Sequence, residues 1–340
     1  MAYTTIDDPS EFFNTVLWSG NSSTQSITGV GFQPDFVWLK SRTNSASHRL
    51  NDSNRGVNKQ LASNSTDAES SFTTMLTSFD SDGFTLGNNV GINGTGYTNV
   101  GWNWKANGGT TSSNSDGTIT STVQANTTAG FSIVTFTGTS TNVTTGHGLN
   151  QAPEIFFAKS RVSNSTNWNT YTSVIDGSLD YLFLNSTDAA GNASNSLPTS
   201  SVLYTNQTDS SVAYCFHSVK GYSKIGKYTG NGNADGTFVY TGFKPAWIMI
   251  HRTDSSGENW QMFDNKRDGF NNGSSSNKML KANVSETEDS NSTGFLDLLS
   301  NGFKIRESAA RHNASGGTYI YMAFAEHPFV SSKGVPVTAR

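Results

Sequence analysis

The chain has 340 residues, of which Ser, Thr and Asn account for 124, while charged residues make up only 14%. The scarcity of Ala, Leu, Glu and Lys excludes long helices built on these strong helix formers. Disorder is also disfavoured, because disordered chains are poor in aromatic residues and this chain has 7 Trp, 11 Tyr and 21 Phe. The composition therefore predicts an all-β protein with polar surfaces and turn-rich connections.

Charge and cysteine content exclude further classes. The net charge is −4 and no basic stripe is present, so we expect no nucleic-acid partner. The apolar runs are far shorter than the ~20 residues that cross a bilayer, and the opening residues do not match a secretory signal, so no membrane insertion is expected. A single cysteine, Cys215, excludes an intrachain disulfide and a cysteine zinc site, and it favours synthesis in a reducing cytoplasm.

The first predicted element is an N-terminal segment, residues 1–15. Asp8-Pro9-Ser10 precedes Glu11 and two phenylalanines, which indicates a short helical turn. The apolar side chains of Ile6, Phe12 and Phe13 are weak candidates for attachment to other proteins. On this interpretation, removal of the segment leaves the rest of the chain folded.

Three related stretches follow, each with a short apolar run just after a proline. The prolines Pro34, Pro153 and Pro245 are 119 and 92 residues apart in the sequence. A second anchor is formed by Arg42, Arg161 and Arg252, whose spacings are 119 and 91. The stretches also end alike, at residues 99–104, 211–216 and 319–324. Near-equal spacing of separate anchors indicates three tandem copies of one unit.

These landmarks divide the chain. The predicted domains are the N-terminal attachment segment 1–15, unit one at 16–108, unit two at 109–221, and unit three at 222–340 with a C-terminal tail. Residues 108–115 are rich in Gly, Ser and Thr, which is typical of a soft linker. The second joint, residues 220–223, is short, so the second and third units are expected to pack rigidly.

Each unit is predicted to be a β-sandwich or a related jelly roll. Residues 131–137 alternate large apolar with small polar side chains, the pattern of a strand with one buried face. The runs 36–39, 155–157 and 247–250 are continuously apolar and indicate central strands buried on both faces. Turns rich in Gly, Asn and Asp separate the strands, and many short strands in ~100 residues are typical of sandwiches. Residues 295–299 are the best candidate for a helix.

Aromatic residues give the strongest binding signal. His48, Trp168 and Trp260 follow the arginine anchors at similar distances, and aromatic faces can stack on sugar rings. They are weak candidates for ligand binding, because the same residues also lie in predicted strands, where core packing is the more common role.

Catalytic and metal sites find little support. Asp52 and Asp264 occupy matching positions near Arg55 and Arg267, which favours a repeated structural ion pair or turn cap over a unique catalyst. The six histidines show no metal-ligand spacing, and the loop at residues 80–83 matches only part of a calcium pattern. We therefore expect no catalytic residues, no metal, no cofactor and no enzymatic activity.

The chain resembles virion-associated proteins of marine phages. The resemblance is carried by residues 1–13 and by the phrases at 130–135, 228–232 and 316–325, and it covers about residues 1–330. It implies a phage virion structural protein with tandem β-rich repeats, of tail-fibre or capsid-decoration type, made in the host cytoplasm and located in the virion. Phage fibres are usually trimers, so the resemblance also suggests a homo-oligomer.

Three functions are considered on this basis. The first is a non-enzymatic tail-associated protein that contacts other virion proteins and recognises a host-surface glycan or lipopolysaccharide. The second is a capsid decoration or fibre-attachment protein with a purely structural role. The third, from another class, is a polysaccharide-degrading enzyme, which would need a pair of carboxylates in one cleft.

Overall fold

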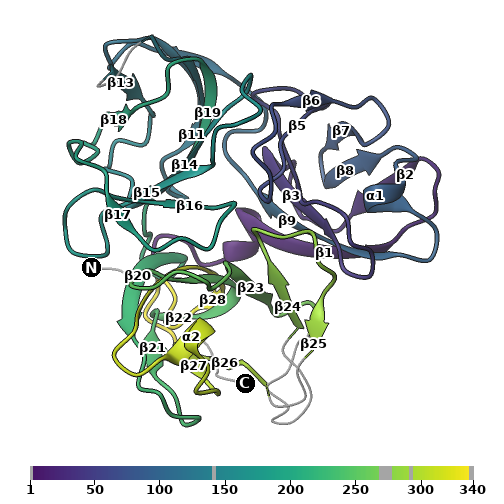
Figure 1. Ribbon diagram of the computed structural model, residues 1–340. Coiled ribbons are helices and arrows are strands. Elements are labelled where there is room, and N and C mark those ends of the chain that lie inside the picture. Colours follow the sequence, from purple (N-terminus) through teal and green to yellow (C-terminus); the bar gives the residue numbers. More distant parts are fainter. Residues whose placement is uncertain (1–2, 140–142, 268–277, 291–293, 337–340) are drawn as a thin grey trace.

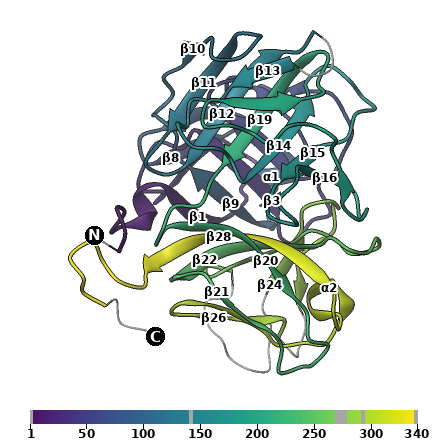
Figure 2. The same cartoon turned by 90° about the vertical axis from the view of Figure 1, so that its left-hand side faces the viewer.

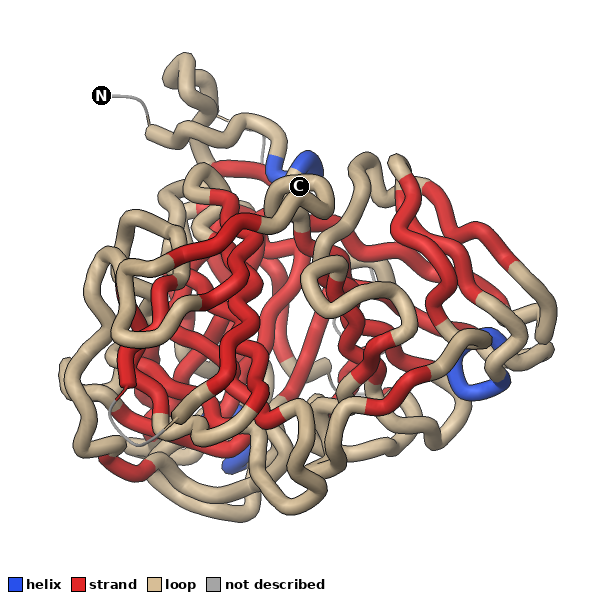
Figure 3. The backbone as a smooth tube through the Cα atoms, turned by 90° about the horizontal axis from the view of Figure 1, so that it is seen from above, coloured by secondary structure: helices blue, strands red, loops and turns tan. Residues whose placement is uncertain are grey.

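The computed structural model describes residues 3–139, 143–267, 278–290 and 294–336. Strands dominate it (Figure 3), which confirms the all-β prediction. The helical segments of the described residues are one turn each, namely η1 (Pro9–Glu11), α1 (Val90–Asn93) and α2 (Ala310–Asn313). Small parts of the predicted N-terminal segment and of units two and three lie outside the described residues.

The strands form three sandwiches, which follow one another along the chain. The first contains β1 (Phe13–Ser19), β2 (Gln25–Thr28), β3 (Phe36–Ser41), β4 (Arg49–Asp52), β5 (Lys59–Gln60), β6 (Ser70–Ser71), β7 (Leu76–Asp80), β8 (Gly83–Leu86) and β9 (Thr98–Trp104). The second contains β10 (Ser112–Asn114), β11 (Ser121–Asn126), β12 (Phe131–Thr137), β13 (Val143–Gly146), β14 (Ile155–Ser160), β15 (Asn169–Thr172), β16 (Asp180–Phe183), β17 (Gly191–Asn192), β18 (Val202–Thr205) and β19 (Ser210–Phe216). The third contains β20 (Ser223–Thr229), β21 (Phe238–Tyr240), β22 (Phe243–Arg252), β23 (Gln261–Asp264), β24 (Lys278–Lys281), β25 (Asp289–Ser290), β26 (Leu296–Leu299), β27 (Gly302–Ile305) and β28 (Thr318–Pro328).

One strand order occurs in all three main sheets. It reads β1-β9-β3-β4 in the first sandwich, β12-β19-β14-β15 in the second and β20-β28-β22-β23 in the third. A smaller sheet faces each main sheet: β2-β8-β7, β13-β18 and β21-β27-β26. The three sandwiches lie around a common centre (Figure 1). The residue boundaries 108 and 221 between the units stay a prediction.

Each main sheet is buried on both faces. Separate apolar clusters fill the space between the main and the small sheet of each sandwich. The opposite faces of all three main sheets meet in one further cluster at the centre of the molecule. This explains why β3 and β14 are buried at every position, since a strand with two covered faces has no room for polar alternation.

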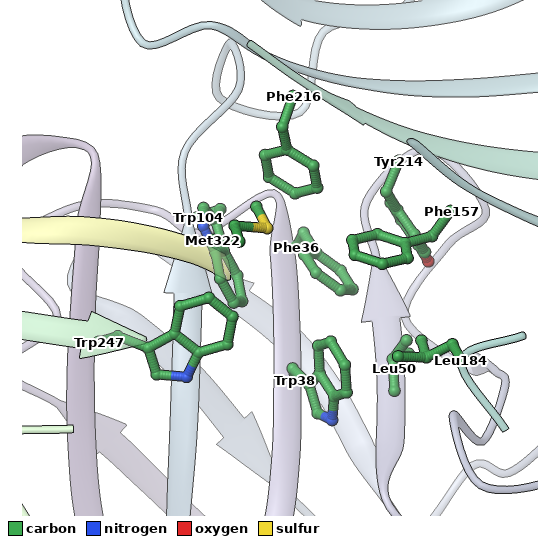
Figure 4. A pocket seen from close by; sticks show the side chains of 10 residues that line it. All are labelled: Phe36, Trp38, Leu50, Trp104, Phe157, Leu184, Tyr214, Phe216, Trp247 and Met322. Carbon is green, nitrogen blue, oxygen red and sulfur yellow. The ribbon is translucent and has the colours of Figure 1, made fainter. Parts of the chain in front are cut away.

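Aromatic side chains from all three sandwiches fill the centre (Figure 4). Trp104 packs edge-on against Trp247, with ring centroids 5.7 Å apart, and Phe36 stacks on Tyr214 at 4.2 Å. Between these rings lies an apolar cavity of only about 10 Å³. A gap of this size holds at most about one water, and apolar gaps stay dry. The three sandwiches therefore share one continuous core.

The N-terminal segment belongs to this core, which corrects the interpretation of an attachment arm. Ile6 and Phe13 are 3% and 2% exposed, and Phe12 packs against the central cluster. Phe13 is the first residue of β1, pairs with Trp104, and stacks on Phe324 of the third sandwich at 4.9 Å. The segment thus joins the first sandwich to the third, near the C-terminal end of the chain (Figure 2).

Two further expectations differ from the structure. Residues 295–299 do not form a helix, because Leu296–Leu299 is strand β26, paired with β27. The 108–115 linker is ordered: Ser112–Asn114 is strand β10, and the amides of Gly108 and Gly109 donate to the buried carboxylate of Asp35 at 2.9 and 2.6 Å. Backbone bonds to a carboxylate supply the rigidity that the composition of the linker lacks.

The position of Phe13 predicts the effect of truncating its side chain. Phe13→Ala is expected to lower the free energy of unfolding by about 3–5 kcal/mol, because it opens a cavity in the central cluster. Leu17→Ala, in the same strand but at a side chain that is 39% exposed, is the matched control and should cost under about 1 kcal/mol. Urea unfolding measures both, and equal effects would contradict the assignment of Phe13 to the core.

Candidate functional site

The three aromatic candidates occupy equivalent places at the joints between the sandwiches. The backbone amides of His48, Trp168 and Trp260 donate to the side chains of Asn64, Asn185 and Asn283, at 3.0, 2.7 and 3.0 Å. Each of the three aromatic side chains is at most 1% exposed. Their faces are covered by protein, so their positions fit core packing rather than stacking on a sugar.

Each of these rings bonds the neighbouring sandwich, and the three bonds form a closed circle. Trp168 donates from Nε1 to the carbonyl of Ala62 at 2.8 Å, and Trp260 donates to that of Phe183 at 3.0 Å. His48 contacts the carbonyl of Lys281 through Nε2 at 3.0 Å. The second sandwich thereby holds the first, the third holds the second, and the first holds the third.

The hydrogen bonds of His48 define its protonation state. Its Nδ1 accepts from Trp38 Nε1 at 2.9 Å, so in the neutral ring Nε2 carries the proton and donates to Lys281. Burial, and next to it the charge of Lys40, hold the pKa of His48 well below its ordinary value. His48 is therefore a neutral structural histidine at pH 7.

Carboxylates and arginines reinforce two of the three joints. Between the first and second sandwiches, Glu69 accepts from Arg161 at 2.9 Å and from Arg55 at 3.0 Å, while Asp52 pairs with Arg55 at 2.5 Å and accepts from Tyr214 at 2.6 Å. Burial acts to raise the pKa of Glu69, but the hydrogen bonds from Arg161 and the charge of Arg55 outweigh it, and the pKa is lowered. The predicted structural role of Asp52 agrees with these contacts.

The joint between the third and first sandwiches repeats this network. Asp264 pairs with Arg267 at 2.5 Å and accepts from Trp102 Nε1 at 3.0 Å. Glu288 accepts from Arg267 at 3.2 Å and from Arg42 at 2.8 Å. Asp52 and Asp264, the two carboxylates considered for catalysis, therefore both lie in buried ion pairs with arginine.

The third joint has the same backbone geometry but uncharged side chains. The amide of Ala190 donates to the carbonyl of Thr253 at 2.8 Å, as those of Glu69 and Glu288 donate to the carbonyls of Arg161 and Arg42 at 2.8 and 2.7 Å. Sheet register and this bond place Thr172, Ala190, Thr253 and Met322 where the other joints carry the network. Ile175 follows Thr172 by three residues, as Arg55 follows Asp52. An uncharged set thus replaces the complete ionic set.

This register also corrects the arginine anchor. Arg252 pairs with Tyr319 as Ser41 pairs with Asn99, so Thr253, and not Arg252, is the counterpart of Arg42 and Arg161. The proline spacing of 92 residues gives the right alignment, and the arginine spacing of 91 is one residue short. Arg252 instead bonds the half-exposed Asp254 at 2.9 Å.

The carboxylates of the loop at residues 80–83 are satisfied by protein donors. Asp82 accepts from the amides of Gly29 and Gly31 at 3.0 and 2.6 Å, and Asp80 accepts from Ser78 and Thr85, both at 2.7 Å. Within the described residues, no group of three or more His, Cys, Asp or Glu side chains could hold a metal ion. In the same part of the chain, no helix is long and apolar enough to cross a membrane.

One open groove of about 520 Å³ lies between the N-terminal segment and the second sandwich, beside the joint to the third. Its lining includes hydroxyl, amide and amine groups, and it consists of Tyr3, Thr4, Thr5, Thr127, Thr128, Gln151, His217, Ser218, Val219 and Lys220. The sequence offered no signal for this groove, because its residues come from the N-terminal segment, two loops and the joint before β20.

Charged and titratable groups of the groove are held in place by local contacts. Lys220 Nζ lies 4.5 Å from the centre of the Tyr3 ring. His217 contacts the carbonyl of Ser218 through Nδ1 at 3.1 Å, and its Nε2 has no hydrogen-bond partner among the described residues. Glu154 accepts from the amide of Ser218 at 2.6 Å. Hydroxyl and amine donors of this kind suit a polar ligand with many hydroxyl groups.

Comparison with known proteins gives one match. The model of the family described as a domain of unknown function, DUF7483, matches residues 8–328. No curated protein and no solved structure matches the chain.

The two kinds of joint predict a stability experiment. Glu69→Ala removes one of the two carboxylate partners of the buried Arg55 guanidinium and the carboxylate partner of Arg161, so it should cost about 3 kcal/mol of unfolding free energy. Replacing the whole network by the residues of the uncharged joint (D52T, R55I, E69A, R161T and Y214M together) should recover most of this loss. Arg252→Ser, which removes a partly exposed pair, is the control and should cost under about 1 kcal/mol. If the quintuple variant is no more stable than E69A, the charged and uncharged joints are not equivalent.

Buried histidines predict loss of stability in mild acid. Burial is the main cause that lowers the pKa of His48, His147, His251 and His312, for His251 to about 4. Because the pKa is lower in the folded state, unfolding takes up a proton in mild acid. The free energy of unfolding therefore falls as the pH drops below about 6.5, and it continues to fall toward pH 4. His251 alone contributes about 3 kcal/mol to this loss. Urea unfolding at pH 7 and pH 5 should show this fall, and it should be less steep for His251→Gln. A flat profile for the wild type would contradict it.

Proposed function

The chain belongs to the DUF7483 family, whose description states no activity, and we propose from its residues and geometry that it is a non-enzymatic structural protein of a phage virion. In this proposal it is a tail-associated component that is displayed on the particle and recognises a glycan or lipopolysaccharide on the host surface. Its partners are other virion proteins and the host glycan.

The observation that carries the proposal is the closed circle of joints around one core. Each sandwich is bonded to both of the others, by Trp168, Trp260 and His48, and the central cluster is shared by all three. Opening any one joint would expose the central cluster, to which all three sandwiches contribute. Resistance to local opening is what a protein displayed outside a cell requires.

The chemistry of the side chains supports binding rather than catalysis. The carboxylates with catalytic potential, Asp52 and Asp264, are engaged in buried ion pairs, and His48 is held neutral by its neighbours. The open groove, in contrast, presents hydroxyl groups and Lys220 to solvent. Hydroxyl, amide and amine groups around a groove are suited to hydrogen bonding with a polysaccharide.

Capsid decoration or fibre attachment is the second candidate, since the same interlocked body also suits a purely structural role. The two candidates differ in location. Electron microscopy of virions labelled with antibody fragments against this protein separates them, because binding at the tail supports recognition and binding over the head supports decoration.

Blocking the displayed protein tests recognition directly. Phage particles saturated with such antibody fragments should adsorb to host cells at least tenfold more slowly than particles treated with unrelated fragments. Adsorption is measured as the decline of free particles with time. An unchanged rate on labelled particles would exclude the receptor-binding role, and release of reducing ends from host polysaccharide by the purified protein would replace it with an enzymatic one.

A further inference from the structure

The third sandwich presents two aromatic rings on its edge strand. Among the described residues, β21 pairs with β27 alone and ends the small sheet on the left of the third sandwich in Figure 1. Phe238 and Tyr240 are 43% and 55% exposed, while Val239 between them is 6% exposed. Since side chains alternate along a strand, both rings stand on the outer face, roughly 7 Å apart.

The fold does not require aromatic residues at these two positions. The buried residue between them faces Phe303, as Ile27 faces Phe84 in the first sandwich and Thr145 faces Leu203 in the second. The residues that flank it in those sandwiches are small or carry a hydroxyl, namely Ser26 and Thr28 in the first and Thr144 and Gly146 in the second. In the second sandwich these positions are partly or fully buried, whereas in the first they are exposed. A single exposed apolar residue needs no explanation, but two on one face, where the first sandwich exposes a serine and a threonine, point to binding.

The N-terminal segment adds a third ring beside them. Tyr3 donates its hydroxyl hydrogen to the carbonyl of Gly242 at 2.8 Å, so the contact of 3.2 Å between the hydroxyls of Tyr3 and Tyr240 has Tyr240 as the donor. A Cβ at residue 242, whose φ is +85°, would lie 2.9 Å from the Tyr3 hydroxyl. The glycine therefore permits a contact that orients the Tyr240 ring, and Tyr3 links it to the groove.

Paired charges border the strip on its other side. Lys304 stands opposite Phe238 in register and pairs with Asp235 at 2.9 Å. Arg306 pairs with Asp297 at 2.5 Å and lies 3.7 Å from Asp235. A protein surface docked here would have to desolvate these charges at a cost, whereas sugar hydroxyls can hydrogen-bond to them. The border thus favours a saccharide.

We infer that Phe238, Tyr240 and Tyr3, here called the aromatic strip, bind a saccharide segment of a surface glycan by ring stacking. The charged border hydrogen-bonds its hydroxyl groups, and the groove beside the N-terminal segment, which Tyr3 also lines, receives the continuing chain. This inference rests on the proposed function and assigns it to a surface that the other two sandwiches lack.

The test exchanges the two β21 residues of the strip for the matching residues of the first sandwich. The full-length wild type and the double variant F238S/Y240T are applied to an array of immobilised bacterial lipopolysaccharides and capsular polysaccharides. For the polysaccharide that binds the wild type best, the variant should show at least tenfold weaker affinity with an unchanged melting temperature. Val162→Ser, at a side chain 60% exposed on the second sandwich, is the control and should bind like the wild type.

The outcomes separate this inference from the proposed function. Equal affinity of F238S/Y240T and wild type would overturn the strip as the site and leave glycan recognition standing. If the purified wild type binds no polysaccharide while antibody fragments still block adsorption of the particles, the saccharide ligand is overturned and the receptor-binding role is retained. Self-association of the wild type that the variant loses would make the strip an interface between copies and overturn the inference as well.

Discussion

The structure depends on the burial of both faces of each main sheet. One face is covered by the small sheet of the same sandwich, and the other is covered only by the two neighbouring sandwiches. A sandwich taken alone would expose a strongly apolar face. In the first sandwich this face carries Val100, Trp102 and Trp104, which are at most 1% exposed here. The hydrophobic free energy of the centre therefore belongs to the three sandwiches jointly, and the hydrogen bonds at the joints fix their arrangement. The sequence similarity divides the chain into three units, but the three sandwiches together form one thermodynamic unit.

The joints show that one geometry can be satisfied by two chemistries. Two joints bury an aspartate, an arginine and a glutamate facing a second arginine, and the third fills the same space with Thr172, Ile175, Ala190 and Thr253. Buried ion pairs gain little net stability over well-packed apolar groups, because desolvation offsets the attraction. The whole set changes together, since a single charge left without its partner is costly. The ionic joints add direction instead, because an arginine and a carboxylate bond only in register.

Much of the strand pattern could be predicted from the sequence, because it depends on local features. Prolines followed by apolar runs correctly indicated β3, β14 and β22, and the matched Asp52 and Asp264 indicated a repeated ion pair. What could not be predicted depends on long-range contacts. Trp168 lies directly before β15, and the local sequence pattern around it is the same whether the ring faces a ligand, the core or a neighbouring sandwich. The strand β26 has apolar residues at spacings that fit a helix as well as a strand, and only its pairing with β27 decides between them. The order of the linker depends on Asp35, which is some 70 residues away in sequence.

Internal comparison offers a physical criterion for finding function in such a chain. Positions at which all three sandwiches agree serve the frame, as the asparagines that hold His48, Trp168 and Trp260 show. Departures at buried positions serve packing. His312 of the third sandwich takes the place of Ile92, as the parallel bonds of Asn313 and Asn93 show. His312 is completely buried and pairs with Glu307, so the change exchanges one internal contact for another. A departure at an exposed position has no such explanation, because solvent would accept the hydroxyls that the first sandwich exposes at Ser26 and Thr28. Phe238 and Tyr240 are a departure of this second kind, and it is this combination of exposure and non-equivalence that distinguishes them from the buried aromatic residues that the sequence makes conspicuous.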